Sequence, residues 1–272
     1  MDHAPHGIQQ RSKQVLREGY TLAMRRFELR SIAAYMTIMA LLVVRLAPGW
    51  AASPWLALTA FMLGYVFADF TSGFVHWAAD TWGTPEWPWV GQALIRPFRE
   101  HHVDQKEITR HDFIETNGNN CFVSLVPGLI ALLLPQGAGR AGTMFASTFI
   151  FSLILWTLFT NQFHKWAHLD APAPWMDRLQ RWHLILPRDH HQIHHTPPYA
   201  KYYCITVGWL NEPLHRVRFF PLMETLVSAV TGLVPREDDI GKKAALSLVE
   251  QGLQAAGGAK VAAEPLAKPP RA

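Results

Sequence analysis

Three long stretches of the sequence contain no charged residue, and this feature constrains the fold more than any other. They cover residues 46–68, 121–139 and 141–163. Because a helix rises about 1.5 Å per residue, about 20 residues cross the hydrocarbon layer of a membrane, and each stretch is long enough to do so. A fourth apolar segment, residues 31–44, is shorter and can span if Arg45 at its end snorkels toward the interface. The sequence therefore predicts four transmembrane helices.

The composition supports a membrane protein and not a soluble domain. Charged residues make up only 17% of the 272-residue chain and hydrophobic residues 49%. Clusters of Pro and Gly at 47–54 and 135–142 mark tight turns, so we expect an all-α integral membrane protein built from two helical hairpins. Residues 1–30 are predicted to form an N-terminal arm, residues 31–235 the four-span domain, and residues 236–272 a variable, partly disordered tail.

The distribution of Lys and Arg predicts the orientation. These residues accumulate on the cytoplasmic side of membrane proteins. Here they are frequent in the N-terminal arm, in the long segment after the second predicted span and in the region after the fourth, whereas the two short turns hold only Arg140. We therefore expect both termini in the cytoplasm. The membrane would be the inner membrane of a bacterium, or the endoplasmic reticulum of a eukaryotic cell.

Several other functions are excluded by what the sequence lacks. The net charge of +4 comes from scattered residues, so no nucleic-acid partner is indicated. Cys121 and Cys204 are far apart, which indicates neither a disulfide framework nor a thiolate zinc site. The sequence has no H-E-x-x-H protease motif, no G-x-S-x-G elbow, and no glycine-rich loop for a phosphate or a dinucleotide.

Histidines gather in four segments of the predicted cytoplasmic layer. Residues 188–195 read RDHHQIHH and residues 164–168 read HKWAH, with histidines three and four positions apart, a spacing that puts side chains on one face of a helix. His101 and His102 are adjacent, and His76 lies near the cytoplasmic end of the second span. The candidate metal ligands are His76, His101, His102, His111, His164, His168, His183, His190, His191, His194 and His195.

So many imidazoles exceed the four ligands that one zinc ion usually takes, and they would suit two iron ions. Metal-bound histidines usually donate their other N–H to a carboxylate or carbonyl oxygen. The acidic residues best placed for this are Asp69, Asp80, Glu100 and Asp189. Asp69 stands out because an acid inside an apolar span is costly; it could hold the register of the site or a headgroup, or only bond to Ser72 or Thr71.

Residues 64–121 and 161–214 resemble the Kua/CarF family of plasmanylethanolamine desaturases. The likeness is dense and extends from about the second span to Thr231. The two histidine boxes of the family fall on residues 164–168 and 191–195. The resemblance thus assigns the catalytic role to His164, His168, His191, His194 and His195.

The resemblance implies an oxygen-dependent desaturase with two irons. Such an enzyme removes hydrogens from the alkyl chain of an ether phospholipid and forms the vinyl ether of a plasmalogen. Its electrons would come singly from a cytochrome b5-like or ferredoxin-like donor. Alternatives that remain open are a desaturase or hydroxylase of phospholipid acyl chains, a membrane protein that handles metal or haem, and a structural membrane protein with an adventitious zinc site.

Overall fold

The computed structural model describes residues 20–84, 86–88, 91 and 95–236, and within these residues all regular structure is helical. The all-α prediction is therefore confirmed for the described part of the chain. The four long helices are α2 (Leu22–Ala52), α3 (Pro54–Thr81), α6 (Phe113–Leu133) and α7 (Ala141–Ala167). The shorter helices are α4 (Arg96–Val103), α5 (Glu107–Arg110), α8 (Pro174–Arg181), α9 (Arg188–His194), α10 (Asn211–Arg216) and α11 (Phe219–Thr231).

Three of the long helices, α2, α3 and α7, are long and apolar enough to cross a membrane, which makes the chain an integral membrane protein. The fourth long helix, α6, has 21 residues and carries asparagines in its first turns. Two of them face α7: Asn117 donates a hydrogen bond to Gln162 at 3.3 Å, and Asn120 donates to the carbonyl oxygen of Thr157 at 2.8 Å. The side-chain amide N–H groups of these two asparagines are thus paired inside the bundle.

The boundary between the first two long helices, α2 and α3, lies at Ser53 and not near residue 45, where the sequence predicted it. Residues 46–52, the beginning of an uncharged stretch assigned to the second span, are the last turns of α2. Arg45 therefore lies inside a helix instead of at its end. Its guanidinium donates to the carbonyl oxygen of Leu134 at 3.1 Å, one of the carbonyls that the end of α6 leaves without a helical partner.

The limits of α6 also differ from the predicted span of residues 121–139. The helix begins at Phe113 because the carboxylate of Asp112 accepts the backbone N–H groups of Ile114 at 2.9 Å and Glu115 at 3.0 Å, a favourable N-cap. It ends at Leu133 because Leu134, the residue before a proline, adopts extended backbone. Hydrophobicity alone shows neither signal.

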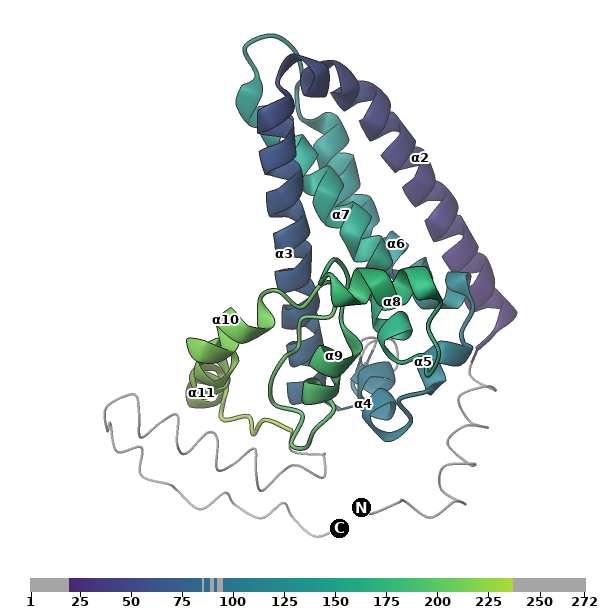
Figure 1. Ribbon diagram of the computed structural model, residues 1–272, viewed down its shortest axis with the longest axis vertical. Coiled ribbons are helices and arrows are strands. Elements are labelled where there is room, and N and C mark those ends of the chain that lie inside the picture. The colour runs from purple at the N-terminus through teal and green to yellow at the C-terminus, as the bar shows by residue number, and fades with distance from the viewer. Residues whose placement is uncertain (1–19, 85, 89–90, 92–94, 237–272) are drawn as a thin grey trace.

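Side-by-side packing pairs α2 with α6 and α3 with α7, while α6 and α7 also pack together. α2 and α3 meet at Ser53 and then diverge, as Figure 1 shows. Close approach of α3 to α7 depends on Gly64, where a Cβ atom would lie 2.5 Å from the carbonyl oxygen of Phe149. The remaining helices gather at the end of the bundle where α3 and α7 finish (Figure 1).

The loop before α10 is tied to α3 by one buried carboxylate. Asp69 is fully buried and accepts the backbone N–H groups of Val207 at 2.9 Å, Gly208 at 2.8 Å and Leu210 at 3.1 Å. The hydroxyl of Ser72 donates to the carbonyl oxygen of Asp69 and not to its carboxylate. Three hydrogen bonds offset the cost of burying this charge. Of the roles that the sequence left open for Asp69, the structure therefore shows the positioning of a loop.

Candidate metal centre

Two groups of ligand atoms converge where the long helices end. The first, here the five-histidine group, consists of His101, His164, His168, His191 and His195. The second, here the Asp80 group, consists of His76, Asp80, His102 and His194. In each group the ligand atoms lie within 4.8 Å of one another, and every member is buried. Such a density of buried metal-ligating atoms is the feature to be explained.

Helical spacing brings these side chains together, as the sequence predicted. α3 supplies His76 and Asp80, which are four residues apart, and α7 with its C-cap supplies His164 and His168 at the same spacing. α4 supplies adjacent histidines, and because neighbouring residues point in different directions on a helix, His101 enters the five-histidine group while His102 enters the Asp80 group. α9 with its C-cap supplies His191 and His195 to the five-histidine group and His194 to the Asp80 group.

The five-histidine group has the ligand spacing of a metal complex. His168 Nε2 lies 3.2 Å from His164 Nε2 and 2.8 Å from His191 Nε2. His195 Nε2 lies 2.9 Å from His191 Nε2 and 3.1 Å from His101 Nε2. With metal–nitrogen bonds of about 2.1 Å, adjacent ligands of an octahedral ion are about 3 Å apart. Five such nitrogens therefore fit around one cation.

The Asp80 group contains a buried carboxylate that receives no hydrogen bond from the described residues. Asp80 Oδ2 lies 3.2 Å from His76 Nε2, 3.4 Å from His194 Nε2 and 3.6 Å from His102 Nε2. Within the described residues, neither oxygen of Asp80 has a hydrogen-bond partner, and the same holds for His76 Nε2. Buried polar atoms are seldom left unpaired, because the cost is high. A cation bound by these four ligands would remove this cost.

Backbone carbonyls fix the tautomer of two ligands in the Asp80 group. His76 Nδ1 lies 3.1 Å from the carbonyl oxygen of Tyr203, and His194 Nδ1 lies 2.9 Å from that of Lys201. Only a protonated Nδ1 can donate to a carbonyl, so Nε2 of each ring keeps its lone pair for a metal. Burial also lowers the pKa of His102 to about 3 and the pKa values of His191 and His195 well below their ordinary value. These imidazoles are thus neutral, the form that binds metal.

The two groups are neighbours. The ring centroids of His76 and His164, one from each group, are 5.9 Å apart, and those of the adjacent residues His101 and His102 are 6.3 Å apart. The donor set is rich in imidazole, with one carboxylate, which suits iron or zinc better than magnesium or calcium. The residues present therefore fit a pair of metal ions.

Three candidate histidines lie outside both groups. The ring of His111 lies 3.5 Å from the carboxylate of Glu107, His190 stacks on Tyr202 with 4.8 Å between centroids, and His183 is exposed. Among the acids, Asp80 falls among the ligands, Asp69 binds a loop and Asp189 is exposed. Glu100 belongs to α4, but its side chain lies outside the described part of the structure, as do His3 and His6.

An ion pair that the sequence did not reveal supports the Asp80 group. Arg236 is completely buried, and its guanidinium donates to Glu224 at 2.6 Å, to the Thr81 hydroxyl at 3.0 Å and to the Tyr203 hydroxyl at 3.2 Å. Thr81 follows Asp80, and Tyr203 supplies the carbonyl that binds His76. The pattern of the tail gives no signal of this role, so the predicted domain boundary had placed Arg236 outside the folded unit.

We predict that Arg236→Met lowers the stability of the protein by about 3 kcal/mol or more, because it leaves the carboxylate of Glu224 buried without its partner. The thermal unfolding midpoint in detergent would fall accordingly. Arg216→Met is the matched control, since Arg216 pairs with Glu212 at 2.7 Å on the surface, with side-chain exposures of 75% and 43%. Exposed pairs contribute about 1 kcal/mol at most. Equal midpoints for the two variants would contradict the supporting role of Arg236.

An integral membrane protein whose described residues form only helices, with two adjoining histidine-rich groups that could hold metal ions, has the features of the class of membrane metalloproteins. The particular family follows from comparison with known proteins. The model of the lipid desaturase domain matches residues 65–238, and the chain belongs to this lipid desaturase family. The matched segment contains every residue of both ligand groups.

Named relatives agree with this assignment. The chain is 55% identical to a plasmanylethanolamine desaturase of Myxococcus xanthus over 89% of its own length and 85% of that protein. It is 46% identical to plasmanylethanolamine desaturase 1 of Mus musculus over 77% of each chain. It is 31% identical to the chloroplastic fatty acid desaturase 4-like 1 of Arabidopsis thaliana over 75% of its length and 68% of the plant protein. No solved structure matches the chain.

Proposed function

We propose that this chain is an ether-lipid desaturase that converts plasmanyl phosphoethanolamine lipids into plasmalogens. The observation that carries the proposal is the pair of buried ligand groups in a chain 55% identical to a plasmanylethanolamine desaturase. The reaction removes one hydrogen from each of C1 and C2 of the O-alkyl chain. O₂ takes up these two hydrogens, together with two protons and two electrons from a donor, and leaves as two molecules of water.

In this proposal His101, His164, His168, His191 and His195 hold one iron, and His76, Asp80, His102 and His194 hold the other. When bound, the two irons supply the oxidant that an unactivated C–H bond requires. The protein contributes position and shielding: the ligands of both groups are buried, so water is kept from the reacting carbons. Tyr203 and Lys201 hold two of the rings in place through their carbonyl groups.

Because the sequence has no nucleotide-binding loop, the two electrons are proposed to come singly from a separate cytochrome b5-like or ferredoxin-like protein. The metal groups lie at the end of the bundle that also holds Arg25 and Arg26 at the start of α2 and Arg96 in α4. We infer that this end faces the cytoplasm, with four spans in the membrane and both termini cytoplasmic. In a bacterium this membrane is the inner membrane, and in a eukaryotic cell the endoplasmic reticulum.

One relative favours a second substrate class. The identity of 31% to a plant fatty acid desaturase is compatible with a double bond placed in an acyl chain of a phospholipid. A protein that only handles metal or haem is disfavoured, because its ligands would be spread along a path through the membrane. Here the ligands come from the ends of α3 and α7 and from α4 and α9, elements that lie together at one end of the bundle (Figure 1).

The test is expression of the full chain with an electron donor in cells that make alkyl-ether phospholipids. We expect acid-labile vinyl ethers in the lipid extract, measured by mass spectrometry, and about two irons per purified chain. The same extracts report new double bonds in acyl chains. If the Myxococcus xanthus relative forms vinyl ethers in these cells and this chain forms none, the ether-lipid proposal is wrong. New acyl double bonds without vinyl ethers would assign the second substrate class instead.

A further inference from the structure

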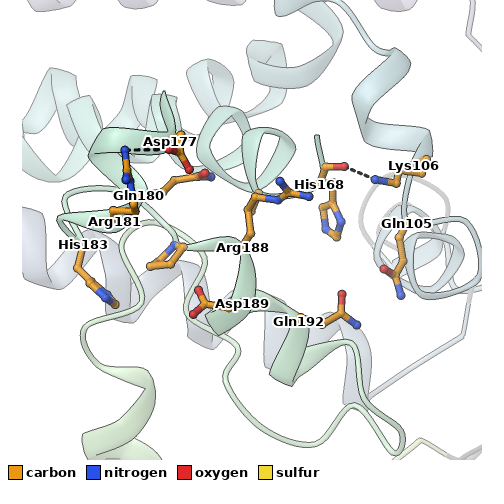
Figure 2. A pocket seen from close by; sticks show the side chains of 12 residues that line it. Gln105, Lys106, His168, Asp177, Gln180, Arg181, His183, Arg188, Asp189 and Gln192 are labelled. Atoms are coloured by element: carbon orange, nitrogen blue, oxygen red, sulfur yellow. Dashed lines mark hydrogen bonds and ion pairs between the residues drawn. The ribbon is translucent and has the colours of Figure 1, made fainter. Parts of the chain in front are cut away.

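A polar cavity of about 620 Å³ adjoins the five-histidine group. It lies between the C-terminal end of α7, the segment after α4, and helices α8 and α9, and Figure 2 shows the side chains in its wall. One of them is His168, a member of the five-histidine group. A molecule in this cavity therefore lies directly against a candidate metal ligand.

Gln180 gives the first sign that the cavity receives a polar ligand. Its side chain lines the cavity and is only 4% exposed. Neither the nitrogen nor the oxygen of its amide has a hydrogen-bond partner within the described residues. A buried amide that lacks both partners is costly for the fold. The unpaired amide of Gln180 is explained if a ligand in the cavity accepts a hydrogen bond from its nitrogen and donates one to its oxygen.

The charges in the wall have both signs. Arg188 lines the cavity, and its guanidinium donates one hydrogen bond to the carbonyl oxygen of Asp170 at 3.2 Å, which leaves further N–H groups for a ligand. Asp189 is next to it in the wall and is exposed. On the opposite side, Lys106 is held by the carbonyl oxygen of His168 at 2.6 Å (Figure 2). One oxygen of the Asp189 carboxylate accepts the backbone N–H of His190 at 2.9 Å, and the carboxylate keeps further lone pairs for a ligand. A guanidinium and a carboxylate in one cavity wall suit a zwitterion better than a purely acidic partner.

Helix α8, which forms part of the cavity wall, and the segment just after it carry exposed side chains typical of the lipid headgroup level. Trp175 and Trp182, at the two ends of α8, are 49% and 64% exposed, and Leu184 is 44% exposed. Trp175 packs against Trp166 of α7 with 5.1 Å between ring centroids, which fixes α8 beside the end of a membrane-spanning helix. Exposed tryptophans favour the interface between lipid and water. These tryptophans indicate that α8, which contributes Asp177, Gln180 and Arg181 to the cavity wall, lies at the level of the lipid headgroups.

We propose that this cavity binds the phosphoethanolamine headgroup of the lipid substrate. Arg188 and the amide N–H of Gln180 bind the phosphate, and the carboxylate of Asp189 binds the ammonium group. The inference rests on the proposed ether-lipid function and names its headgroup site. Six covalent bonds separate the phosphorus from C1 of the O-alkyl chain, about 7 Å when extended. A headgroup in the cavity therefore leaves C1 and C2 within reach of the metal groups behind His168.

The test measures equilibrium binding of radiolabelled O-alkyl phosphoethanolamine and O-alkyl phosphocholine lipids to the iron-loaded full chain in mixed micelles. Arg188→Gln should weaken binding of both lipids about tenfold, because a charge-assisted hydrogen bond is lost. Gln180→Met, which keeps the volume but not the amide, should weaken both severalfold. Asp189→Asn should reduce the preference for phosphoethanolamine over phosphocholine, since a choline group has no N–H to donate.

Arg178→Gln is the matched control, because Arg178 is exposed on α8 outside the cavity wall. It should bind both lipids as the wild type does. The iron content and the unfolding midpoint of every variant identify any that fails to fold. In turnover, the cavity variants should raise KM more than they lower kcat.

Two outcomes would overturn the headgroup site. In the first, Arg188→Gln and Gln180→Met bind both lipids like the wild type. In the second, Arg188→Gln leaves lipid binding intact and slows reduction by the donor protein, which would make the cavity a docking surface for that protein. Neither result touches the proposed function. That function fails separately, if the wild-type chain binds the lipid but makes no vinyl ether from it.

Discussion

Replacing His191 by alanine should reduce vinyl-ether formation by at least about a hundredfold and release iron from the five-histidine group. His191 is central to that group, with its Nε2 2.8 Å from His168 Nε2 and 2.9 Å from His195 Nε2. Its ring is 1% exposed, so water can reach the vacated position only by rearrangement. The measurements are vinyl ethers by mass spectrometry and iron per purified chain.

His190→Ala is the matched control for this prediction. His190 precedes His191 on α9, but its ring stacks on Tyr202 and belongs to neither ligand group. We expect its iron content to equal that of the wild type and its activity to stay within about twofold, as for a substitution away from the site. Comparable iron loss in both variants would mean that α9 holds its histidines in another arrangement. Full activity of His191→Ala would refute the assignment outright.

The contrast between these two neighbours shows where sequence reasoning reaches its limit. Spacing of three and four residues predicted that the histidines of α7 and α9 share a face, and they do, because helical periodicity is a local property. Spacing could not tell which ring of His190 and His191 points inward, since both have partners at i+4. That choice depends on how α9 packs against α7, which is tertiary structure.

The transmembrane helices show a similar division. The absence of charge predicted where apolar helices lie, because a charge in hydrocarbon is costly and therefore rare in a membrane-spanning segment. It misplaced their ends. Arg45 is tolerated inside α2 because a carbonyl group of another helix accepts its hydrogen bond, and α6 starts early because Asp112 caps it. Both depend on specific partners that a hydrophobicity pattern does not contain.

The ion pair of Arg236 and Glu224 could not be predicted from the sequence either, because it also depends on specific tertiary partners. Arg236 and Glu224 are 12 residues apart and far from Asp80 in the chain, yet they are buried together beside Thr81. A charged residue next to a polar tail is normally predicted to be exposed, and only the fold shows that Arg236 is buried. In contrast, the sequence did place Asp80 among the acidic residues near the histidines, although its position did not distinguish a ligand from a hydrogen-bond acceptor.

Asp80→Asn is expected to lower the iron content from about two to about one per chain and to abolish vinyl-ether formation. Asp80 is the single carboxylate among the ligands of the two described groups, so it is the only ligand there that offsets the charge of a cation. Three imidazoles remain in its group, but a dication buried with neutral ligands alone is far less stable. The five-histidine group should keep its metal, which makes partial iron loss the distinctive result.

A second readout separates metal loss from misfolding. Metal that binds only the folded state raises the unfolding midpoint, so chelator treatment should lower the midpoint of the wild type. In Asp80→Asn the drop should be smaller, because one site is already empty. Asp170→Asn is the control: its carboxylate is 86% exposed and pairs with Lys106 at the surface, so iron content, midpoint and chelator response should match the wild type. Two irons per chain in Asp80→Asn would show that the three histidines suffice, and that the unpaired carboxylate at the end of α3 serves the fold and not a metal.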